Sequence, residues 1–114
     1  MATTTLTIEH VLTLLAATPR RIGEVTAGVA PARLRTRPSE DEWSANEVLA
    51  HLRACADVRG GAILTILAED TPTICAVDPR RWMREETDYP DLDFRRSLRA
   101  FAKNEPACWR SWKR

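Results

Sequence analysis

The sequence predicts an all-α domain with three long helices, and three observations lead to this prediction. Apolar residues recur at helical spacing in three separate stretches, near residues 6–28, 45–68 and 92–105. A complete helix-start signal, Ser44 followed by Glu47, precedes the second stretch. No stretch shows the alternation of apolar and polar residues that is typical of a half-buried β-strand.

The first stretch is interrupted by Thr18 and Pro19. Threonine is a good N-cap, and proline is tolerated in the first turn of a helix because its missing N–H would have no partner there. We therefore expect residues 6–16 to be helical and a second helical segment to begin at Pro19. The result would be a bent or broken first helix that ends near Gly28. The apolar stripe of its second part consists of Ile22, Val25 and Val29.

Residues 30–41 contain two prolines and several charges, so we expect a connector with one helical turn around 32–34. The connector leads into Ser44, whose hydroxyl can accept a hydrogen bond from the amide of Glu47. The Glu47 carboxylate can reach back to the amide of Ser44, and this reciprocal pair is a capping box. The sequence therefore predicts a helix start directly after Ser44.

The second helix is predicted to run from residue 45 to about residue 68. Trp43 precedes the cap and Val48 follows it at the positions of a hydrophobic staple, which would fix how the chain enters the helix. Gly60 and Gly61 lie inside this helix and cost about 1 kcal/mol each relative to alanine. A glycine pair lets another helix approach closely or bends its own helix, and either effect suits a helical bundle.

Residues 70–91 form a long connection with three prolines, and a short helical turn is expected at 79–83. Loops of this length in a compact domain are usually functional or mobile. Asp91 or Asp93 is expected to cap the third long helix, and Pro106 is expected to stop it. The apolar face of this helix consists of Leu92, Phe94, Leu98 and Phe101.

The composition is that of an ordinary globular domain. Of 114 residues, 44% are hydrophobic and 29% are charged, which favours one folded domain over a disordered chain. The 17 basic and 16 acidic residues give a net charge of +1, so there is no general electrostatic case for binding nucleic acid or an anionic membrane. No secretory signal and no run of about 20 apolar residues is present, so no membrane span is expected.

The three cysteines are Cys55, Cys75 and Cys108, an odd number at wide spacing without a CxxC pair. This pattern does not indicate a disulfide framework and favours a reducing compartment, so we expect a cytoplasmic protein. Cys55 lies on the inner face of the second helix and is interpreted as a small apolar filler. Cys75 lies in a loop, where a thiol is open to oxidation.

His51 is the best candidate for a functional residue. It follows Glu47 by one helical turn and precedes Cys55 by one turn, so the three side chains can share a face. A neutral imidazole is a common ligand of divalent metals, and Glu47 could orient it. The alternative is a structural histidine whose two nitrogens are both hydrogen-bonded. Catalytic zinc usually has three protein ligands, and His51 with Cys55 would still lack one.

A resemblance adds to this interpretation. The segment TPRRIGEVTAGVAPARLRTRPSEDEWSANEVLAHL, and most specifically its WSxxEVLxHL pattern, resembles the N-terminal half of the DinB-like metal-binding four-helix-bundle superfamily. This superfamily includes mycothiol- and bacillithiol-dependent enzymes, among them mycothiol-dependent maleylpyruvate isomerase. The resemblance covers roughly residues 6–105. It implies that His51 is the first of three ligands to a divalent metal such as zinc or nickel. It also implies a low-molecular-weight thiol cosubstrate and a homodimer.

The sequence departs from this family at its C-terminal end. The other two ligands usually come from an HxxxH-like pair on the last helix, but no histidine follows His51, and His10 is expected on the surface of the first helix. We therefore expect an incomplete DinB-like domain at 1–105, with the fourth helix missing or replaced by a tail at 106–114 rich in Trp, Arg and Cys. The tail is either a genuine segment that docks on the bundle or a partner, or the product of a shifted reading frame near residue 105.

Three functional hypotheses follow. The first is a DinB-like relative of thiol-dependent S-transferases and isomerases in which His51 is a partial metal ligand, so that metal binds weakly or not at all. The second is a non-catalytic helical interaction domain, because three helices of a four-helix pattern leave an apolar groove that a second copy or a partner helix would fill. The third is a truncated and poorly stable product. The sequence leaves open whether the protein is an enzyme.

Overall fold

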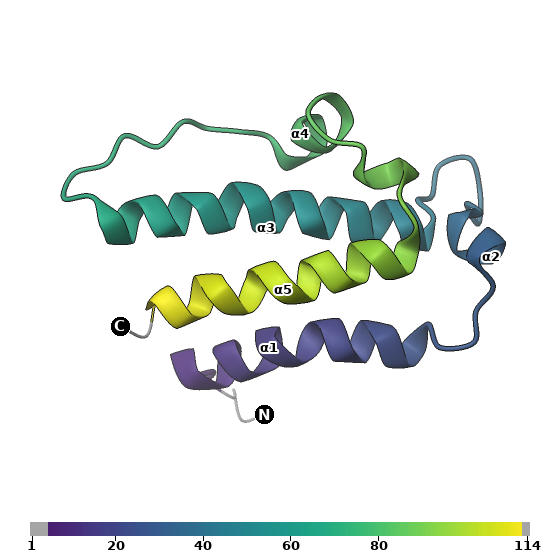
Figure 1. Cartoon of the computed structure of the whole chain (residues 1–114), viewed down its shortest axis with the longest axis horizontal. Helices are drawn as coiled ribbons and strands as arrows, with labels where there is room; N and C mark the ends of the chain where they lie inside the picture. Colours follow the sequence, from purple (N-terminus) through teal and green to yellow (C-terminus); the bar gives the residue numbers. More distant parts are fainter. Residues whose placement is uncertain (1–4, 113–114) are drawn as a thin grey trace.

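The computed structural model describes the backbone of residues 5–112 and the side chains of residues 5–103. Within these residues every regular element is helical, which confirms an all-α fold with three long helices (Figure 1). The elements in chain order are α1 (Ile8–Val25), α2 (Pro31–Arg35), α3 (Ala45–Ala68), α4 (Pro79–Glu85), the 3-10 helix η1 (Tyr89–Asp91) and α5 (Phe94–Trp112).

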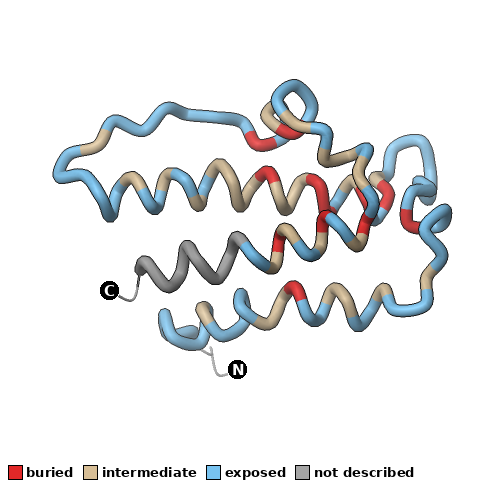
Figure 2. Tube along the Cα trace, viewed as in Figure 1, coloured by how far each residue is buried: buried red, intermediate tan, exposed pale blue. Residues whose placement is uncertain are grey.

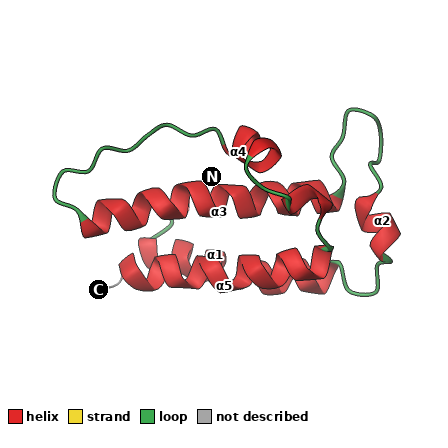
Figure 3. Ribbon diagram, turned by 45° about the horizontal axis from the view of Figure 1, so that its top comes forward, coloured by secondary structure: helices red, strands yellow, loops and turns green. Residues whose placement is uncertain are grey.

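The three long helices lie side by side, with α5 between α3 and α1 and packed on both (Figure 1). Helices α3 and α5 run in the same direction and α1 runs in the opposite direction. This topology requires a long crossover between α3 and α5, of a kind that some helical bundles contain. The crossover returns along α3 and carries α4 and η1, both of which pack on α3 (Figure 3).

Helix α1 is continuous through Pro19, so the predicted break at Thr18 is wrong. Thr7 caps the helix by accepting a hydrogen bond from the amide of His10 over 3.1 Å. The hydroxyl of Thr18 instead donates to the carbonyl of Leu14 over 2.9 Å, as a threonine inside a helix can do. Proline removes one helical hydrogen bond, but Pro19 is buried, and this apolar burial offsets part of the cost.

Helix α3 confirms the predicted start and length. The hydroxyl of Ser44 accepts from the amide of Glu47 over 3.1 Å, and the amide of Ser44 donates to the Glu47 carboxylate over 3.1 Å. The expected contact between Trp43 and Val48 is less important, because Val48 is 46% exposed. Trp43 packs instead on a buried cluster, which fixes the entry of the chain. That cluster consists of Ala50, Ala54 and Met83.

The core lies at one end of the molecule, where α3 and α5 begin (Figure 2). Besides the cluster under Trp43, it contains a second cluster between α2, α3 and α5. This second cluster consists of Leu34, Leu49, Phe94 and Phe101. At the opposite end of the molecule, none of the described residues 8–18 and 61–78 is buried. The aliphatic side chains of that half therefore remain largely open to solvent.

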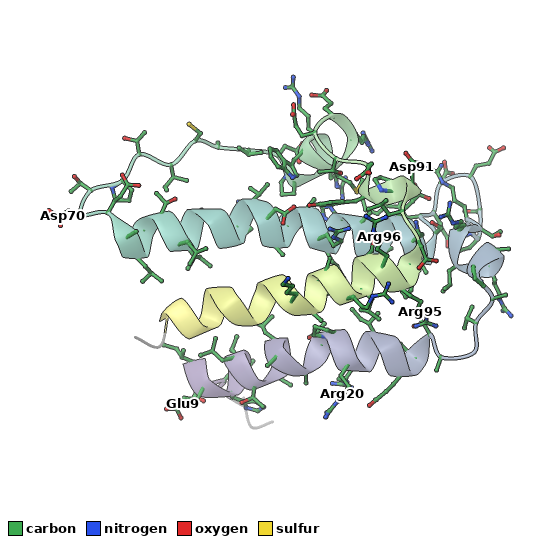
Figure 4. The ribbon with its side chains drawn as sticks, viewed as in Figure 1. Glu9, Arg20, Asp70, Asp91, Arg95 and Arg96 are labelled. Atoms are coloured by element: carbon green, nitrogen blue, oxygen red, sulfur yellow. The ribbon has the colours of Figure 1, made fainter. Side chains whose placement is uncertain are left out.

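Polar contacts hold the start of α5 in place. The carboxylate of Asp93 accepts from the amide of Arg96 over 3.1 Å, so Asp93 is the cap of the two candidates. Arg95 lies between α5 and the end of α1, where its guanidinium donates to the hydroxyl and the carbonyl of Thr26 over 2.8 and 2.5 Å (Figure 4). These bonds supply a cation and donors to the C-terminal end of α1, where helical carbonyls lack partners.

The backbone of α5 continues to Trp112, so the predicted stop at Pro106 is wrong. Proline removes one hydrogen bond and strains the preceding turn, but it does not prevent helix on either side of it. The backbone is thus helical across the predicted boundary between residues 105 and 106. The side chains of the tail at 106–114, including that of Cys108, lie outside the described ones.

Candidate functional site

His51 lies half-buried in the second turn of α3, beside Cys55 as predicted. Its Nε2 atom is 3.5 Å from the Sγ atom of Cys55. Its Nδ1 atom is buried without a hydrogen-bond partner among the described residues, so these residues supply a partner to only one of the two ring nitrogens. The ring of Trp43 meets the imidazole edge-on, with the ring centroids 5.3 Å apart and the planes at 73°. Buried polar atoms without a hydrogen-bond partner are uncommon in folded proteins, so this nitrogen is a notable feature of the site.

The thiol of Cys55 is in the protonated form near neutral pH. Burial raises its pKa, and the positive charge of Arg59 opposes this effect without reversing it. A reactive cysteine needs a lowered pKa, because the thiolate is the nucleophile. Cys55 in this state is therefore suited to filling space, as predicted, or to binding a metal that displaces the proton.

Glu47 does not orient His51, contrary to the expectation from helical spacing. Its carboxylate accepts two hydrogen bonds from the guanidinium of Arg37, over 2.8 and 2.7 Å, and one from the amide of Ser44. These bonds, with that of Arg37 first, lower the pKa of Glu47 to about 2. Glu47 thus joins the connector before α3 to the first turn of that helix, and the imidazole has no carboxylate behind it.

The described residues provide part of a metal site but not a complete one. With bond lengths of about 2.0–2.1 Å to nitrogen and 2.3 Å to sulfur, two ligands of tetrahedral zinc lie roughly 3.6 Å apart. The separation of 3.5 Å between His51 and Cys55 matches this spacing. However, no group of three or more His, Cys, Asp or Glu side chains in the described part of the chain could hold a metal ion. The three-ligand site that the resemblance implies does not fit these residues.

A polar network in the middle of α3 was not anticipated. The hydroxyl of Tyr89 in η1 donates to the carboxylate of Asp57 over 2.5 Å. The guanidinium of Arg53 stacks over the ring of Tyr89 at 3.7 Å and donates to the hydroxyl of buried Ser97 in α5 over 3.3 Å. The sequence held one signal of this network, because Arg53 and Asp57 are opposite charges one turn apart on the helix.

Asp57 also lines a cavity of about 240 Å³ between α3 and the crossover segment. Figure 3 shows how this segment runs back along α3. The crossover was expected to be functional or mobile, and it forms one wall of this cavity. The exposed thiol of Cys75 lies in that wall, as its loop position predicted. The cavity is lined by Asp57, Val58, Ala62, Thr65, Thr73, Ile74, Cys75, Val77 and Trp82.

The remaining predicted residue, His10, is exposed on α1, which confirms its expected surface position. In comparisons with family models, curated proteins and solved structures, the chain has no match. No helix in the described range of residues combines the length and apolarity needed to cross a bilayer.

Proposed function

We propose that this protein is a helical interaction domain that associates with a second copy of itself through an open apolar face on α1 and α3. The observation that carries the proposal is the exposure of eight aliphatic side chains, between 36% and 62% of each, in the half of the molecule where none of residues 8–18 and 61–78 is buried. This open apolar face is defined by Ile8, Val11, Leu14 and Leu15 of α1 with Ile63, Leu64, Ile66 and Leu67 of α3.

The arrangement of the helices explains why this face is open. In a four-helix bundle each helix packs on two neighbours around a shared core. Helix α5 has two long neighbours, α1 and α3, but each of these has only α5 (Figure 1). A further helical surface that packs on both α1 and α3 would complete the bundle. This surface would then cover the exposed aliphatic side chains, which lie on the apolar stripes that the sequence pattern assigns to a core.

The size of the face suits a protein interface. A standard interface covers about 800 Å² on each partner, of which about 60% is apolar. Full burial of one aliphatic side chain is worth about 1.5–3 kcal/mol, which at about 25 cal/mol per Å² corresponds to roughly 60–120 Å², so eight half-exposed side chains supply apolar area on the order of 400 Å². This area provides most of the apolar part of such an interface. The largest exposed apolar patch on a typical monomer covers about 300–600 Å² and is often functional, and the apolar area of this face lies within that range.

A second copy is the occupant that the chain itself can supply. A two-fold axis brings the same surface of both copies together, so a contact between two different parts of that surface is made twice. Here the patch on α1 can cover the patch on α3 of the partner, and each contact is made twice. All four patches are then buried without any other protein.

The test is the mass of the protein in solution, measured by sedimentation equilibrium over a range of concentrations. The unmodified chain is expected at twice its own mass, and Leu14→Glu and Ile66→Glu are expected at the mass of one chain. Val25→Glu is the matched control, because Val25 is 79% exposed on α1 but lies outside the open apolar face. A charge placed in an apolar interface is costly, whereas the same charge on a solvated surface is not.

Circular dichroism distinguishes loss of association from loss of folding in these variants. A single-chain mass for the unmodified protein at its highest soluble concentration would contradict the proposal. A dimer that persists in both Glu variants would place the interface elsewhere. A cooperative thermal transition of the unmodified chain would also count against a merely truncated, unstable product.

A second candidate function follows from the DinB-like resemblance. In it, His51 binds a divalent metal such as zinc or nickel in a cytoplasmic protein that uses a low-molecular-weight thiol. The supporting observation is the zinc-like spacing of 3.5 Å between Nε2 of His51 and Sγ of Cys55. The remaining ligands would have to come from outside the described side chains, so no reaction step is assigned to the metal.

Equilibrium dialysis against zinc tests this second candidate. We expect weak binding that His51→Ala abolishes and that His10→Ala, the matched control on α1, leaves unchanged. Equal binding by both variants would exclude His51 as a ligand. Sequencing the gene across codon 105 tests the shifted reading frame, because another frame that encodes an HxxxH pair would supply the two missing ligands.

A further inference from the structure

We propose that the cavity between α3 and the crossover binds a small organic cation, a primary amine that carries one compact apolar group. The inference is independent of the proposed dimer, because none of the residues that line the cavity belongs to the open apolar face. It rests on three features of the cavity: an unpaired carboxylate, apolar walls and a negative surrounding charge.

The carboxylate is that of Asp57. One of its oxygens accepts the hydrogen bond from Tyr89, but among the described side chains Asp57 forms no ion pair. Arg53, one helical turn away, is the natural partner, yet its guanidinium stacks on the ring of Tyr89 and donates to Ser97. A bound ammonium group would supply the ion pair that Asp57 lacks, at a half-buried position where solvent and salt screen such a pair less than at the open surface.

The walls of the cavity suit an apolar group next to that charge. Val58 and Ala62 of α3 face Ile74 and Val77 of the crossover, and Trp82 of α4 closes one side. The volume of about 240 Å³ lies below the range of about 300–1,000 Å³ that is usual for drug-sized ligands. The ligand is therefore small, with an ammonium group at Asp57 and one ring or short chain between the aliphatic side chains.

The charge around the cavity favours a cation. A neighbouring hollow of about 420 Å³ shares Val77 and Trp82 with the cavity. Its lining includes the carboxylates of Asp78, Glu85 and Glu86 and the single guanidinium of Arg81, which gives a net charge of −2. With Asp57, the linings of the two hollows contain four carboxylates and one guanidinium, and such an excess of negative charge favours cations over anions.

Trp82 supplies the means to observe binding. Its indole N–H is buried and has no hydrogen-bond partner among the described residues. The signal of this group in a ¹H–¹⁵N spectrum, assigned with Trp82→Phe, reports on the cavity directly. The probe is 2-phenylethylamine, and its comparators are 2-phenylethanol, which lacks the charge, and 3-phenylpropionate, which reverses it.

We expect saturable shifts of the Trp82 signal with the amine, and affinity weaker by about tenfold or more for the alcohol, as loss of a charge-assisted contact implies. Asp57→Asn should bring the amine to the affinity of the alcohol. Tyr89→Phe is the matched control, because it removes the hydrogen bond to Asp57 but keeps the charge. It should therefore still bind the amine.

Ala62→Leu keeps Asp57 and fills the cavity, so it should abolish binding even if Asp57→Asn does not fold. Three results would overturn the proposal: no saturable shift with the amine, equal affinity for the amine and the alcohol, or unchanged affinity in folded Asp57→Asn or Ala62→Leu. The oligomeric state of the protein enters none of these readouts, so failure here is distinguishable from failure of the proposed dimer.

Discussion

The hydroxyl of Tyr89 lies 2.5 Å from the carboxylate of Asp57, and this bond joins the end of the crossover to the middle of α3. The crossover must return along α3 before α5 can begin, so its position depends on such contacts. The guanidinium of Arg53 stacks on one face of the same ring. Tyr89 is thus held from two sides by one helix.

The Tyr89 bond predicts a loss of stability in alkali. Burial, followed by the hydrogen bond and negative charge of Asp57, raises the pKa of Tyr89 above its usual value of 10.0. The folded state therefore holds this proton more tightly than the unfolded state does. The contribution of Tyr89 to the free energy of unfolding is fully present below pH 10 and is lost as the pH rises through the raised pKa of Tyr89. Tyr89 is the only tyrosine in the chain, so tyrosinate absorbance reports its titration directly.

Tyr89→Phe supplies the comparison for this titration. It should lower the free energy of unfolding at pH 7 by about 1–2 kcal/mol, because the partly buried Asp57 loses its donor. It should also remove the tyrosine-linked part of the alkaline loss. Urea unfolding at pH 7 and pH 10.5 measures both effects. A pKa of Tyr89 at or below 10 would contradict the contact.

The pair of Glu47 and Arg37 predicts a loss of stability in acid. The pKa of Glu47 is lowered from 4.5 to about 2. The contribution of this carboxylate to the free energy of unfolding is therefore present above pH 4.5 and is lost as the pH falls towards 2. Arg37 is 53% exposed, and solvent screening therefore limits the contribution to about 1 kcal/mol. Glu47→Gln should remove this dependence while it keeps the capping box, which accepts glutamine.

Urea unfolding between pH 2 and pH 7 measures the acid dependence of the two proteins. The matched control is Glu9→Gln, which changes an exposed carboxylate in the first turn of α1. The control should follow the unmodified protein through the acid range. Parallel profiles for Glu47→Gln and the unmodified protein would show that Arg37 does not hold Glu47 in solution.

Asn46 is predicted to be essential for the junction between α3 and α5. This residue is buried, and its amide nitrogen donates to the carbonyls of Pro90 and Leu92 over 2.8 and 3.1 Å. Asn46→Ala leaves both carbonyls without this donor and should cost about 2–3 kcal/mol of unfolding free energy. Urea unfolding measures the loss. A change below about 0.5 kcal/mol, the usual size of a surface effect, would contradict this role.

Local signals were sufficient to predict the helices, but the neighbours of the site residues required the folded chain. The capping box lies within four residues, so the sequence placed the start of α3 correctly. Thr18 and Pro19 also form a local start signal, but α1 had already begun at a better cap, Thr7, and burial of Pro19 favoured one continuous helix. Propensity is a weak prior that such tertiary burial overrides.

For the candidate site too, contacts within one helical turn could be predicted from the sequence, and contacts between distant segments could not. Helical spacing correctly placed His51 beside Cys55, because one turn fixes their distance. It also suggested Glu47 as a partner of His51, but Arg37, ten residues earlier in the connector, takes that carboxylate. The bond between Tyr89 and Asp57 spans 32 residues of sequence, and no local pattern contains it.

Two glycines are predicted to respond oppositely to the same substitution. Gly28 has a φ of 78°, in the left-handed region, and Gly61 lies inside α3 with no such φ. A Cβ atom would meet nothing within 4 Å at either site, so packing does not distinguish them.

Gly28→Ala should destabilise the protein by about 1 kcal/mol through backbone strain. Gly61→Ala should stabilise it by about 0.5–1 kcal/mol through helix propensity and a less flexible unfolded chain. Thermal unfolding of the two variants side by side measures the difference. Each variant is the control for the other, because both replace a glycine by alanine. Stabilisation by both would mean that the turn after α1 does not require a left-handed residue, and destabilisation by both would mean that α3 is not helical around residue 61.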